Sequence, residues 1–239
     1  MNAKTTQLLS LTPLEKAPAQ GVNLWVYHSL RRALMCGQIE PGLPLTIRGL
    51  AEVMHVSPMP VREALHRLTC EGAVEVRDNR RVMVPQMTAA RFKELYELRI
   101  VLETHAAESA LPYCRPEHIT ELERLDNLID LAYQHSDTGE GSLANQEFHR
   151  YLYQRNPFQV AVPLIESVWL QLGPFVRFAK NKLTQHYRID RHKEALQALR
   201  QQNAFALRRA IEADIRDGLA SIQAVEGIHE HFKEQALSA

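Results

Sequence analysis

Cysteine is scarce in this sequence of 239 residues. The three cysteines, Cys36, Cys70 and Cys114, are widely spaced and form no CxxC pair. An odd number of isolated cysteines offers no obvious disulfide framework. We therefore expect reduced thiols, as in a cytoplasmic protein.

Long hydrophobic runs are missing as well. No uninterrupted apolar stretch approaches the roughly 18 residues that a membrane-spanning helix needs. The first residues, Met1 to Gly21, contain neither the apolar segment nor the small-residue cleavage pattern of an export signal. We therefore expect no membrane partner and a cytoplasmic location.

An excess of charge of either sign is also lacking, since 28 Lys and Arg residues balance 28 Asp and Glu residues. The chain as a whole is not a polycation, so any nucleic-acid site must gather its positive charge locally. Hydrophobic residues make up 45% of the sequence, which is enough for a sizeable core. The length suits one large domain or two smaller ones.

Glycine and proline are unevenly distributed. They are dense between residues 37 and 85, whereas the sequence after Met87 consists of long helical periods with few breaks. This shift predicts a domain boundary near residues 85–88. We expect a mobile tail at residues 1–20, a first domain at 21–87 and a second domain at 88–232.

Three helices are predicted at the start of the first domain. Apolar residues at intervals of three or four predict a helix that ends at Gly37, with Leu24 on its buried face. Thr46 is the expected cap of a short second helix. After a three-residue turn, Ser57 is the expected cap of a third helix, whose first position suits Pro58.

Valines alternate along the chain after the third helix. They occupy positions 74 and 76, then 82 and 84, on either side of Asp78-Asn79. Two alternating runs across a two-residue link predict a β-hairpin. Helix, short helix, turn, helix and hairpin is the order of a winged helix-turn-helix, which is the fold predicted for this domain.

Arginines gather on the elements that would approach DNA. Residues 22–87 hold eight arginines and six acidic residues, so the excess of positive charge is small but localised. An α-helix fits the major groove of DNA, where Arg binds guanine or phosphate. The uncovered face of the third helix carries Met59, Arg62, His66 and Thr69.

The alternative is that these arginines are solvated or pair with Glu52, Glu63 and Glu75. We expect this alternative, solvation or pairing, for Arg67, and DNA contact for Arg62 because it projects from the uncovered helix face. The full set of expected DNA contacts is Arg48, Ser57, Met59, Pro60, Arg62, His66, Arg77, Arg80 and Arg81.

Fixed spacings run through the first domain. They are Gly37-x-Ile39-x-Pro41-Gly42-x-x-Leu45, Leu50-Ala51, and Val56-Ser57-x-x-Pro60-Val61-Arg62-Glu63-Ala64-Leu65-x-x-Leu68-x-x-x-Gly72. This pattern resembles the DNA-binding domain of GntR-type bacterial transcription regulators. Two positions depart from that family. Pro58 stands where the family usually has Arg, which implies one contact fewer and an altered operator preference. His55 stands where it usually has Gly, which is tolerable if His55 adopts a left-handed backbone.

Helical periodicity without strands continues through the second domain. Six helices are expected, with the fourth interrupted at Gly173-Pro174, because proline inside a helix costs about 3 kcal/mol or kinks it. The predicted ranges are 88–111, 116–135, 142–154, 160–186, 189–202 and 203–226. Six helices of this length form a compact all-α bundle with room for an internal site.

Polar residues occupy otherwise apolar helix faces in this bundle. Asn145 and His149, four residues apart, share one face, while His192 and Asp214 lie on two later helices. Two imidazoles and a carboxylate suit zinc, nickel, iron or manganese. The alternative is that both histidines are hydrogen-bonded core residues and that Asp214 caps a helix or pairs with an arginine.

Three motifs stand out in the second domain. They are Leu98-Arg99-x-x-Leu102-Glu103, Asn145-x-x-Phe148-His149 and His192-x-x-x-Leu196-x-x-Leu199. They resemble the FCD effector domain of the fatty-acid-regulator branch of the same family. That resemblance implies a divalent metal held by Asn145, His149, His192 and Asp214. The family has Asp or Asn at the first of these positions and normally has His at the last, where this chain has Asp214.

The resemblance also implies a small carboxylate effector that completes the metal coordination. Arg99 is the candidate for holding that carboxylate, with Arg177 as a second candidate. The alternative for Arg99 is an ion pair with a buried acid such as Glu103 or Asp214.

These features predict a mostly α protein with an N-terminal winged helix-turn-helix and a C-terminal FCD-type bundle. The expected function is a homodimeric transcription repressor, not an enzyme, which a small effector releases from a palindromic double-stranded DNA operator. Two alternatives stay open. A metal-dependent enzyme of the helical-bundle type would use the His/His/Asp centre, although no clear general base accompanies it. A metal-free regulator would take a larger apolar or acyl ligand.

Overall fold

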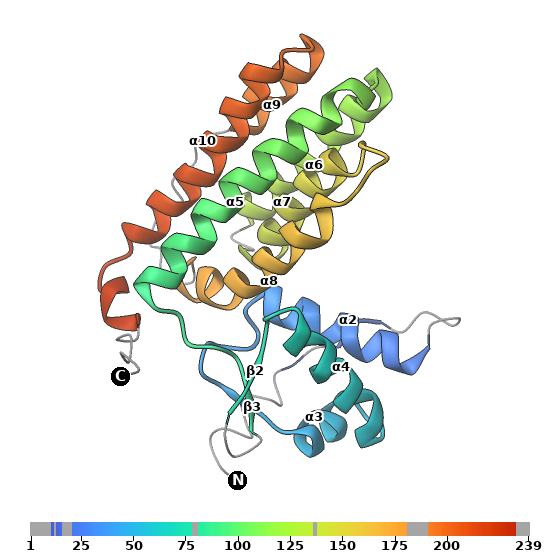
Figure 1. Cartoon of the computed structure of the whole chain (residues 1–239), viewed down its shortest axis with the longest axis vertical. Helices are drawn as coiled ribbons and strands as arrows, with labels where there is room; N and C mark the ends of the chain where they lie inside the picture. Colours follow the sequence, from blue (N-terminus) through green and yellow to red (C-terminus); the bar gives the residue numbers. More distant parts are fainter. Residues whose placement is uncertain are drawn as a thin grey trace. The chain divides into compact units, whose positions relative to one another are not determined.

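The fold is that of a computed structural model, which describes residues 11, 13–15, 21–77, 81–135, 138–180 and 191–232. The chain divides into two units (Figure 1). The first comprises Met1–Thr88, Trp169–Phe178 and Phe232–Ala239, and the second comprises Ala89–Val168 and Ala179–His231. The sequence did not predict that the segment Trp169–Phe178 groups with the first unit.

The first unit contains the predicted winged helix-turn-helix. Its helices are α2 (Val22–Met35), α3 (Ile47–Val53) and α4 (Pro58–Cys70), and its strands are β1 (Pro44–Leu45), β2 (Glu75–Val76) and β3 (Val82–Met83). The strands form an antiparallel sheet in the order β1-β3-β2. Strand β1, which the sequence pattern did not reveal, widens the hairpin into a small sheet.

The hairpin is present, but its predicted two-residue link is wrong. Val76 lies opposite Val82, and the amide of Arg77 donates to the carbonyl of Arg81 at 2.9 Å. The link between the last hydrogen-bonded pair, Arg77 and Arg81, therefore contains three residues, 78–80. The physical reason is the register: valines face one another only when the link holds an odd number of residues.

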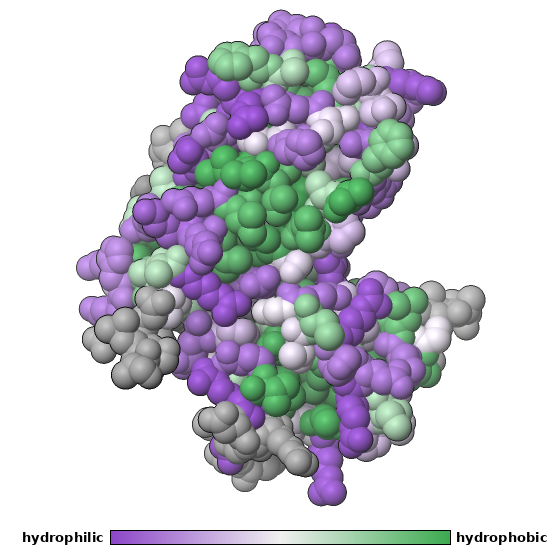
Figure 2. Space-filling view, viewed as in Figure 1, coloured by the Kyte–Doolittle hydropathy of each residue, from purple (hydrophilic) through white to green (hydrophobic). Residues whose placement is uncertain are grey.

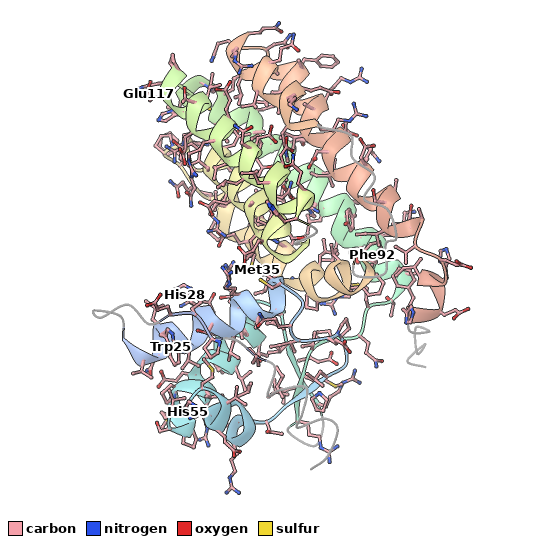
Figure 3. All side chains as sticks on the ribbon, turned by 180° about the vertical axis from the view of Figure 1, so that it is seen from behind. Trp25, His28, Met35, His55, Phe92 and Glu117 are labelled. Atoms are coloured by element: carbon pink, nitrogen blue, oxygen red, sulfur yellow. The ribbon has the colours of Figure 1, made fainter. Side chains whose placement is uncertain are left out.

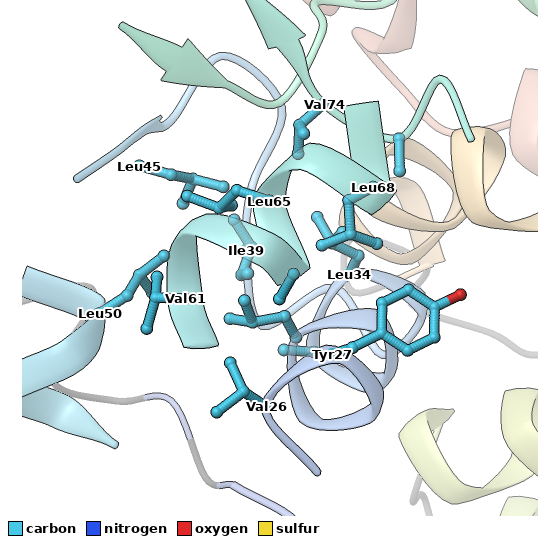
Figure 4. Packing of buried hydrophobic residues seen from close by; sticks show 14 of the residues in the cluster. Val26, Tyr27, Leu34, Ile39, Leu45, Leu50, Val61, Leu65, Leu68 and Val74 are labelled. Atoms are coloured by element: carbon cyan, nitrogen blue, oxygen red, sulfur yellow. The ribbon is translucent and has the colours of Figure 1, made fainter. Parts of the chain in front are cut away.

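The core of the first unit lies where its helices meet. Val26 and Leu34 of α2 pack with Leu50 of α3 and Val61 of α4, and all four are fully buried (Figure 4). Leu24, which was expected on the buried face, is instead 45% exposed. The side of α2 that faces α4 is centred on Val26 and Leu34, so Leu24 falls at its edge.

The described positions before residue 16 contact α2. Leu11 is buried in the core of the first unit. Trp25 donates its Nε1–H to the carbonyl of Leu14 at 2.7 Å, and the amide of Leu14 donates to Ser29 Oγ at 3.1 Å. Leu11 and Leu14 therefore have fixed contacts in the first unit, whereas residues 1–10, 12 and 16–20 of the predicted mobile tail lie outside the described residues.

The turn of the helix-turn-helix places His55 in the left-handed region, with a φ of 52° (Figure 3). The amide of His55 donates to the carbonyl of Glu52, and the amide of Val56 donates to that of Ala51. This pair of bonds is the Schellman arrangement, which satisfies the last carbonyls of α3. His55 thus meets the condition under which it is tolerable in place of glycine.

The second unit is helical throughout its described residues, as predicted. Its elements are α5 (Ala89–Ala110), η1 (Leu111–Tyr113), α6 (Pro116–Gln134), α7 (Thr138–Tyr153), α8 (Ala161–Lys180, shared with the first unit), α9 (Arg191–Arg200), α10 (Ala204–Gln223) and η2 (Ile228–His231). Helix α7 begins at Thr138, ahead of the predicted range 142–154.

The predicted interruption at Gly173-Pro174 is also wrong, because α8 continues through both residues. A Cβ atom on Gly173 would lie 3.0 Å from the Cα of Met35, so only glycine fits at this distance. Leu170 and Leu172 beside the pair are buried. Their burial offsets the cost of about 3 kcal/mol that proline imposes within a helix.

Neighbouring helices of the second unit close a ring in the described part of the chain. Helix α5 packs against α7 and α10, α6 packs against α7 and α9, and α9 packs against α10. The ring encloses apolar side chains such as Phe148, Leu152 and Leu122, which are fully buried. Each of its five helices also turns at least one polar side chain inward.

The turn at His55 yields a testable prediction. Replacing His55 with Val should destabilise the protein by about 1–2 kcal/mol, because a branched side chain resists the left-handed region. His55→Asn should leave stability nearly unchanged, since Asn tolerates that conformation. Urea unfolding midpoints measure both effects. Equal midpoints for His55→Val and the wild type would show that the turn relaxes to another conformation.

Candidate functional site

The N-terminus of α4 is exposed and open. Ser57 occupies the N-cap position, yet its side chain makes no capping hydrogen bond, and Pro58 takes the first helical position as predicted. Amides and the helix dipole at such an end attract anions, including phosphate. By contrast, Thr46 caps α3 as predicted and accepts from the amide of Gly49 at 3.1 Å.

The outer face of α4 presents most of the side chains that were expected there. Arg62 and His66 are exposed, and Met59 is 58% exposed. Pro60 is buried, so the expectation that it contacts DNA is wrong. The reason is helical geometry, because Pro60 lies one turn before Ala64 on the side of α4 that packs into the core.

Arg62 keeps its charge available. It forms no ion pair with any residue that the structure describes, and the neighbouring Glu63 accepts instead from the side-chain amide of Asn23. Arg48 is likewise exposed, near the start of α3. Both guanidinium groups therefore face solvent on the helix-turn-helix itself.

Arg67 has a different role. Its guanidinium carbon lies 3.8 Å from the centre of the Tyr27 ring, and its Nε donates to Glu71 at 3.3 Å. The hydroxyl of Tyr27 donates to the same carboxylate at 2.5 Å. Burial and this hydrogen bond raise the pKa of Tyr27 to about 12. Arg67 thus joins α4 to α2, through Glu71 and not through any of the acids named as alternative partners.

The hairpin contributes less free charge than its sequence suggests. Arg77 Nε donates to Glu75 Oε1 at 2.7 Å, so Arg77 is paired with one of the acids named as its alternative partner. Arg81 is exposed at the other side of the loop. Arg80 lies outside the described residues.

Three side chains from three helices meet at the centre of the second unit. His149 of α7, His192 of α9 and Asp214 of α10 bring one ligand atom each within 4.8 Å of one another. Asp214 Oδ2 lies 3.2 Å from His149 Nε2, and Asp214 Oδ1 lies 3.8 Å from His192 Nε2. Both imidazoles are buried, and the carboxylate is 20% exposed.

Asn145 lies beside this centre. Its side-chain amide donates to His192 Nε2 at 3.1 Å. To present its oxygen to a metal ion, Asn145 would have to turn its amide group over. The structure therefore brings all four predicted ligand residues together, three of them with a ligand atom near the centre.

A second layer of polar groups surrounds the imidazoles. His149 Nδ1 lies 3.0 Å from the hydroxyl of Tyr153, which donates to Glu103 Oε2 at 3.0 Å. His192 Nδ1 lies 3.0 Å from Asp126 Oδ1. Glu103, Asp126 and Tyr153 are buried.

Sequence reasoning missed Asp126 and Tyr153. A signal existed for each. Tyr153 follows His149 by four residues and so shares its helix face, and Asp126 lies between the buried Leu122 and Ile129 on one face of α6.

Arg99 is held next to the centre by Glu103. Its Nε donates to Glu103 Oε1 at 2.6 Å, so the ion pair named as the alternative is present. Although burial alone would lower the pKa of Arg99, the charge of Glu103 raises it, and Asp214 adds to that effect. The side chain of Arg177, the second effector candidate, lies outside the described residues.

The electrostatic field of the cluster keeps its groups in distinct charge states. Although burial by itself would raise the pKa of Asp214, the hydrogen bond with His149 and the nearby His192 and Arg99 hold that pKa well below its usual value. Burial and the nearby Glu103 carboxylate hold the pKa of Tyr153 well above its usual value. Asp214 is therefore an anion and Tyr153 a neutral donor at neutral pH.

A winged helix-turn-helix followed by a helical unit with a buried polar centre defines a transcription regulator with a DNA-binding part and a sensor part. The profile of the gntR family of bacterial regulatory proteins matches residues 24–84, and that of the FCD domain matches residues 94–217. The chain therefore belongs to the FCD-containing branch of the GntR family, whose members are transcription regulators and not enzymes.

Relatives of known name are regulators of the same kind. The HTH-type transcriptional regulator McbR of Escherichia coli is 29% identical over 157 residues, which cover 66% of this chain and 71% of McbR. The HTH-type transcriptional repressor RspR of the same organism is 27% identical over 151 residues, or 63% of this chain and 66% of RspR. The solved structure of E. coli McbR shares the fold, with a TM-score of 0.80 and 24% identity over 85% of this chain and 98% of that one.

Among the described residues, no helix combines the length and the apolar character needed to cross a bilayer.

The exposed position of Arg62 leads to a prediction for DNA binding. Arg62→Ala should weaken operator binding at least tenfold, since one bidentate contact contributes about 1–3 kcal/mol. Arg67→Ala is the matched control, because it removes the same charge from the same helix at a residue bound to Tyr27. Fluorescence anisotropy with an operator recovered by genome-wide mapping measures both. If Arg62→Ala binds as well as the wild type, α4 is not the recognition helix.

Proposed function

We propose that this protein is a repressor that binds a divalent metal ion and is released from its operator by a small carboxylate effector. The observation that carries the proposal is the charge balance at the centre of the second unit. Glu103, Asp126 and Asp214 supply three negative charges there, and Arg99 supplies one positive charge. With neutral imidazoles, as metal ligands require, two negative charges remain for a divalent cation to neutralise.

The contact between His149 and Asp214 supports the same conclusion. Tyr153 donates its hydroxyl proton to Glu103, so its oxygen accepts from His149 Nδ1–H. His149 Nε2 then carries a lone pair and faces the Asp214 carboxylate at 3.2 Å. Two acceptors this close need a cation between them, which is either a second proton on the imidazole or a metal ion.

The spacing of the ligand atoms fits a metal. Bonds of about 2.0–2.2 Å place tetrahedral ligand atoms roughly 3.3 Å apart. The two separations involving Asp214 are 3.2 and 3.8 Å, so small side-chain movements complete the site. Two nitrogen ligands and one oxygen ligand suit zinc, nickel, iron or manganese. When bound, the metal supplies a positively charged position that attracts a carboxylate ligand.

The effector carboxylate has a second partner in Arg99. Its Nε is engaged by Glu103, but a guanidinium group carries four further N–H donors. The surface of α10 is open at Gly218, since a Cβ there would meet no described atom within 4 Å. Gly218 lies one turn after Asp214. A small carboxylate between Arg99 and the metal fits these features.

Release from DNA follows from a shift between two arrangements of the protein. The effector must bind the DNA-free arrangement more tightly than the DNA-bound one, since equal affinity would change nothing. Salt should weaken operator binding steeply, because phosphate neutralisation supplies much of the affinity.

A homodimer is part of the proposal. Two helix-turn-helix motifs related by a two-fold axis would match a palindromic operator. Figure 2 shows a hydrophobic area over α5, where Leu98 and Val101 are 43% and 63% exposed. An exposed apolar helix face of this kind supports association with a second copy.

The metal site is tested by removing its imidazoles. The combination His149→Ala and His192→Ala should abolish metal binding, because only Asp214 and the weak ligand Asn145 remain. His105→Ala, at an exposed position of α5, is the control. Mass spectrometry should measure the metal content of protein purified without chelators or a nickel column. Stoichiometric metal in the double variant would place the site elsewhere, and a metal-free wild type would favour the metal-free regulator.

The effector site is tested by a conservative change at Arg99. At least one member of a panel of small carboxylates should lower the operator affinity of the wild type. Arg99→Lys should lose most of that response and keep its operator affinity, because Lys retains the charge beside Glu103 but not the planar fork. Anisotropy titrations with and without each carboxylate measure this. A carboxylate that raised operator affinity would contradict release as the mechanism.

A further inference from the structure

We propose that Tyr153 and Asp126 are positioning residues of the metal centre. Each fixes one imidazole so that its Nε2 lone pair faces Asp214. This inference rests on the proposed metal site. It concerns residues that lie behind the ligands, on helices α6 and α7, and contact no metal themselves.

The hydrogen-bond direction at Tyr153 is set by its partners. Glu103 Oε2, 3.0 Å from the hydroxyl, can only accept, so the hydroxyl proton points to Glu103. The Tyr153 oxygen therefore accepts from His149 Nδ1–H at 3.0 Å. The proton on Nδ1 leaves Nε2 as the atom with a lone pair, and that atom faces Asp214.

The proton position on His192 is set in the same way, except that a carboxylate, that of Asp126, contacts Nδ1 directly. Asp126 Oδ1 lies 3.0 Å from Nδ1 and can only accept, so Nδ1 carries the proton. The side-chain amide of Asn145 donates to Nε2 at 3.1 Å, which independently requires a lone pair on that nitrogen. Both imidazoles thus present Nε2 as an acceptor toward one point.

Burial makes these polar side chains costly for packing alone. The side chains of Glu103 and Tyr153 are at most 1% exposed, and Asp126 is 5% exposed. Burying a carboxylate costs several kcal/mol unless partners compensate it. Glu103 would already be compensated by Arg99 through Oε1, so the contact of Oε2 with Tyr153 is not needed for that purpose.

Outer hydrogen bonds of this type orient the ring of a ligand histidine and raise the basicity of its free nitrogen. Without the Tyr153 hydroxyl, His149 Nδ1–H would lose a buried acceptor. The ring would then turn or move its proton to Nε2, and either change removes the lone pair from the metal. Loss of an outer partner typically weakens metal binding by about 10–100-fold.

The test compares Tyr153→Phe with Tyr151→Phe, a tyrosine on the same helix whose ring lies under Arg155. The probe is Co²⁺, measured in competition with a chelator and by its visible absorption. Tyr153→Phe should bind Co²⁺ about 10–100-fold more weakly, with an altered spectrum, while Tyr151→Phe should match the wild type. Wild-type affinity and spectrum in Tyr153→Phe would overturn the proposal.

Nitrogen-15 NMR of the imidazoles provides a readout that a purely structural role would not move. In the wild type without added metal, His192 should carry its proton on Nδ1. When His149 is neutral, its single proton should also lie on Nδ1. Tyr153→Phe should change the His149 signals and leave those of His192. An Nε2–H form of His149 that persists at high pH in the wild type would overturn the assignment.

Asp126→Asn provides the second variant if Tyr153→Phe folds poorly. It keeps the shape of the side chain but can donate to Nδ1, so Co²⁺ affinity should fall while the His149 signals stay unchanged. Unchanged affinity would contradict the role of Asp126. If the wild type binds no Co²⁺, the proposed function fails, whereas the NMR result still decides how the imidazoles are oriented.

Discussion

The burial of several charged groups inside one ring of helices is the constraint on which the second unit depends. Carboxylates cannot leave water unless other groups supply protons or positive charge. Arg99 compensates Glu103, and His192 donates to Asp126. Asp214 is left facing two nitrogens that have lone pairs when neutral. A positive charge at this point, from a second imidazole proton or a metal ion, would therefore stabilise the interior that these helices form.

The core of the first unit, by contrast, contains no buried charged cluster among its described residues. Its core is apolar and needs no compensation, so its polar side chains remain free to face outward. The Schellman turn at His55 directs α4 away from α3, and the buried Pro60 sets which side of α4 packs. Arg62 is consequently left on the outer face. The proposed regulator needs both arrangements. The first unit must present positive charge to DNA, and the second must surround a ligand with buried charged groups.

Much of the fold could be predicted because it depends on local rules. The cap at Thr46 and the left-handed His55 follow from residue type and position, and helix periodicity located the helices of the second unit to within a few residues. The errors have a common origin. Pro174 stays within a helix because surrounding residues are buried, and the hairpin link is set by which valines face each other. Both depend on contacts between distant segments, which a local pattern does not contain.

The amino-acid sequence by itself determined the family, the helix-turn-helix and the identity of the four candidate ligands, because spacing along a helix decides which residues share a face. Only the tertiary structure decided how these residues work together. It turned Asp214 toward His149 and not toward an arginine, tied Arg67 to Tyr27, and set Asp126 and Tyr153 behind the imidazoles. The physical reason is that hydrogen-bond direction and charge compensation depend on distances between helices, and those distances exist only after the ring has closed.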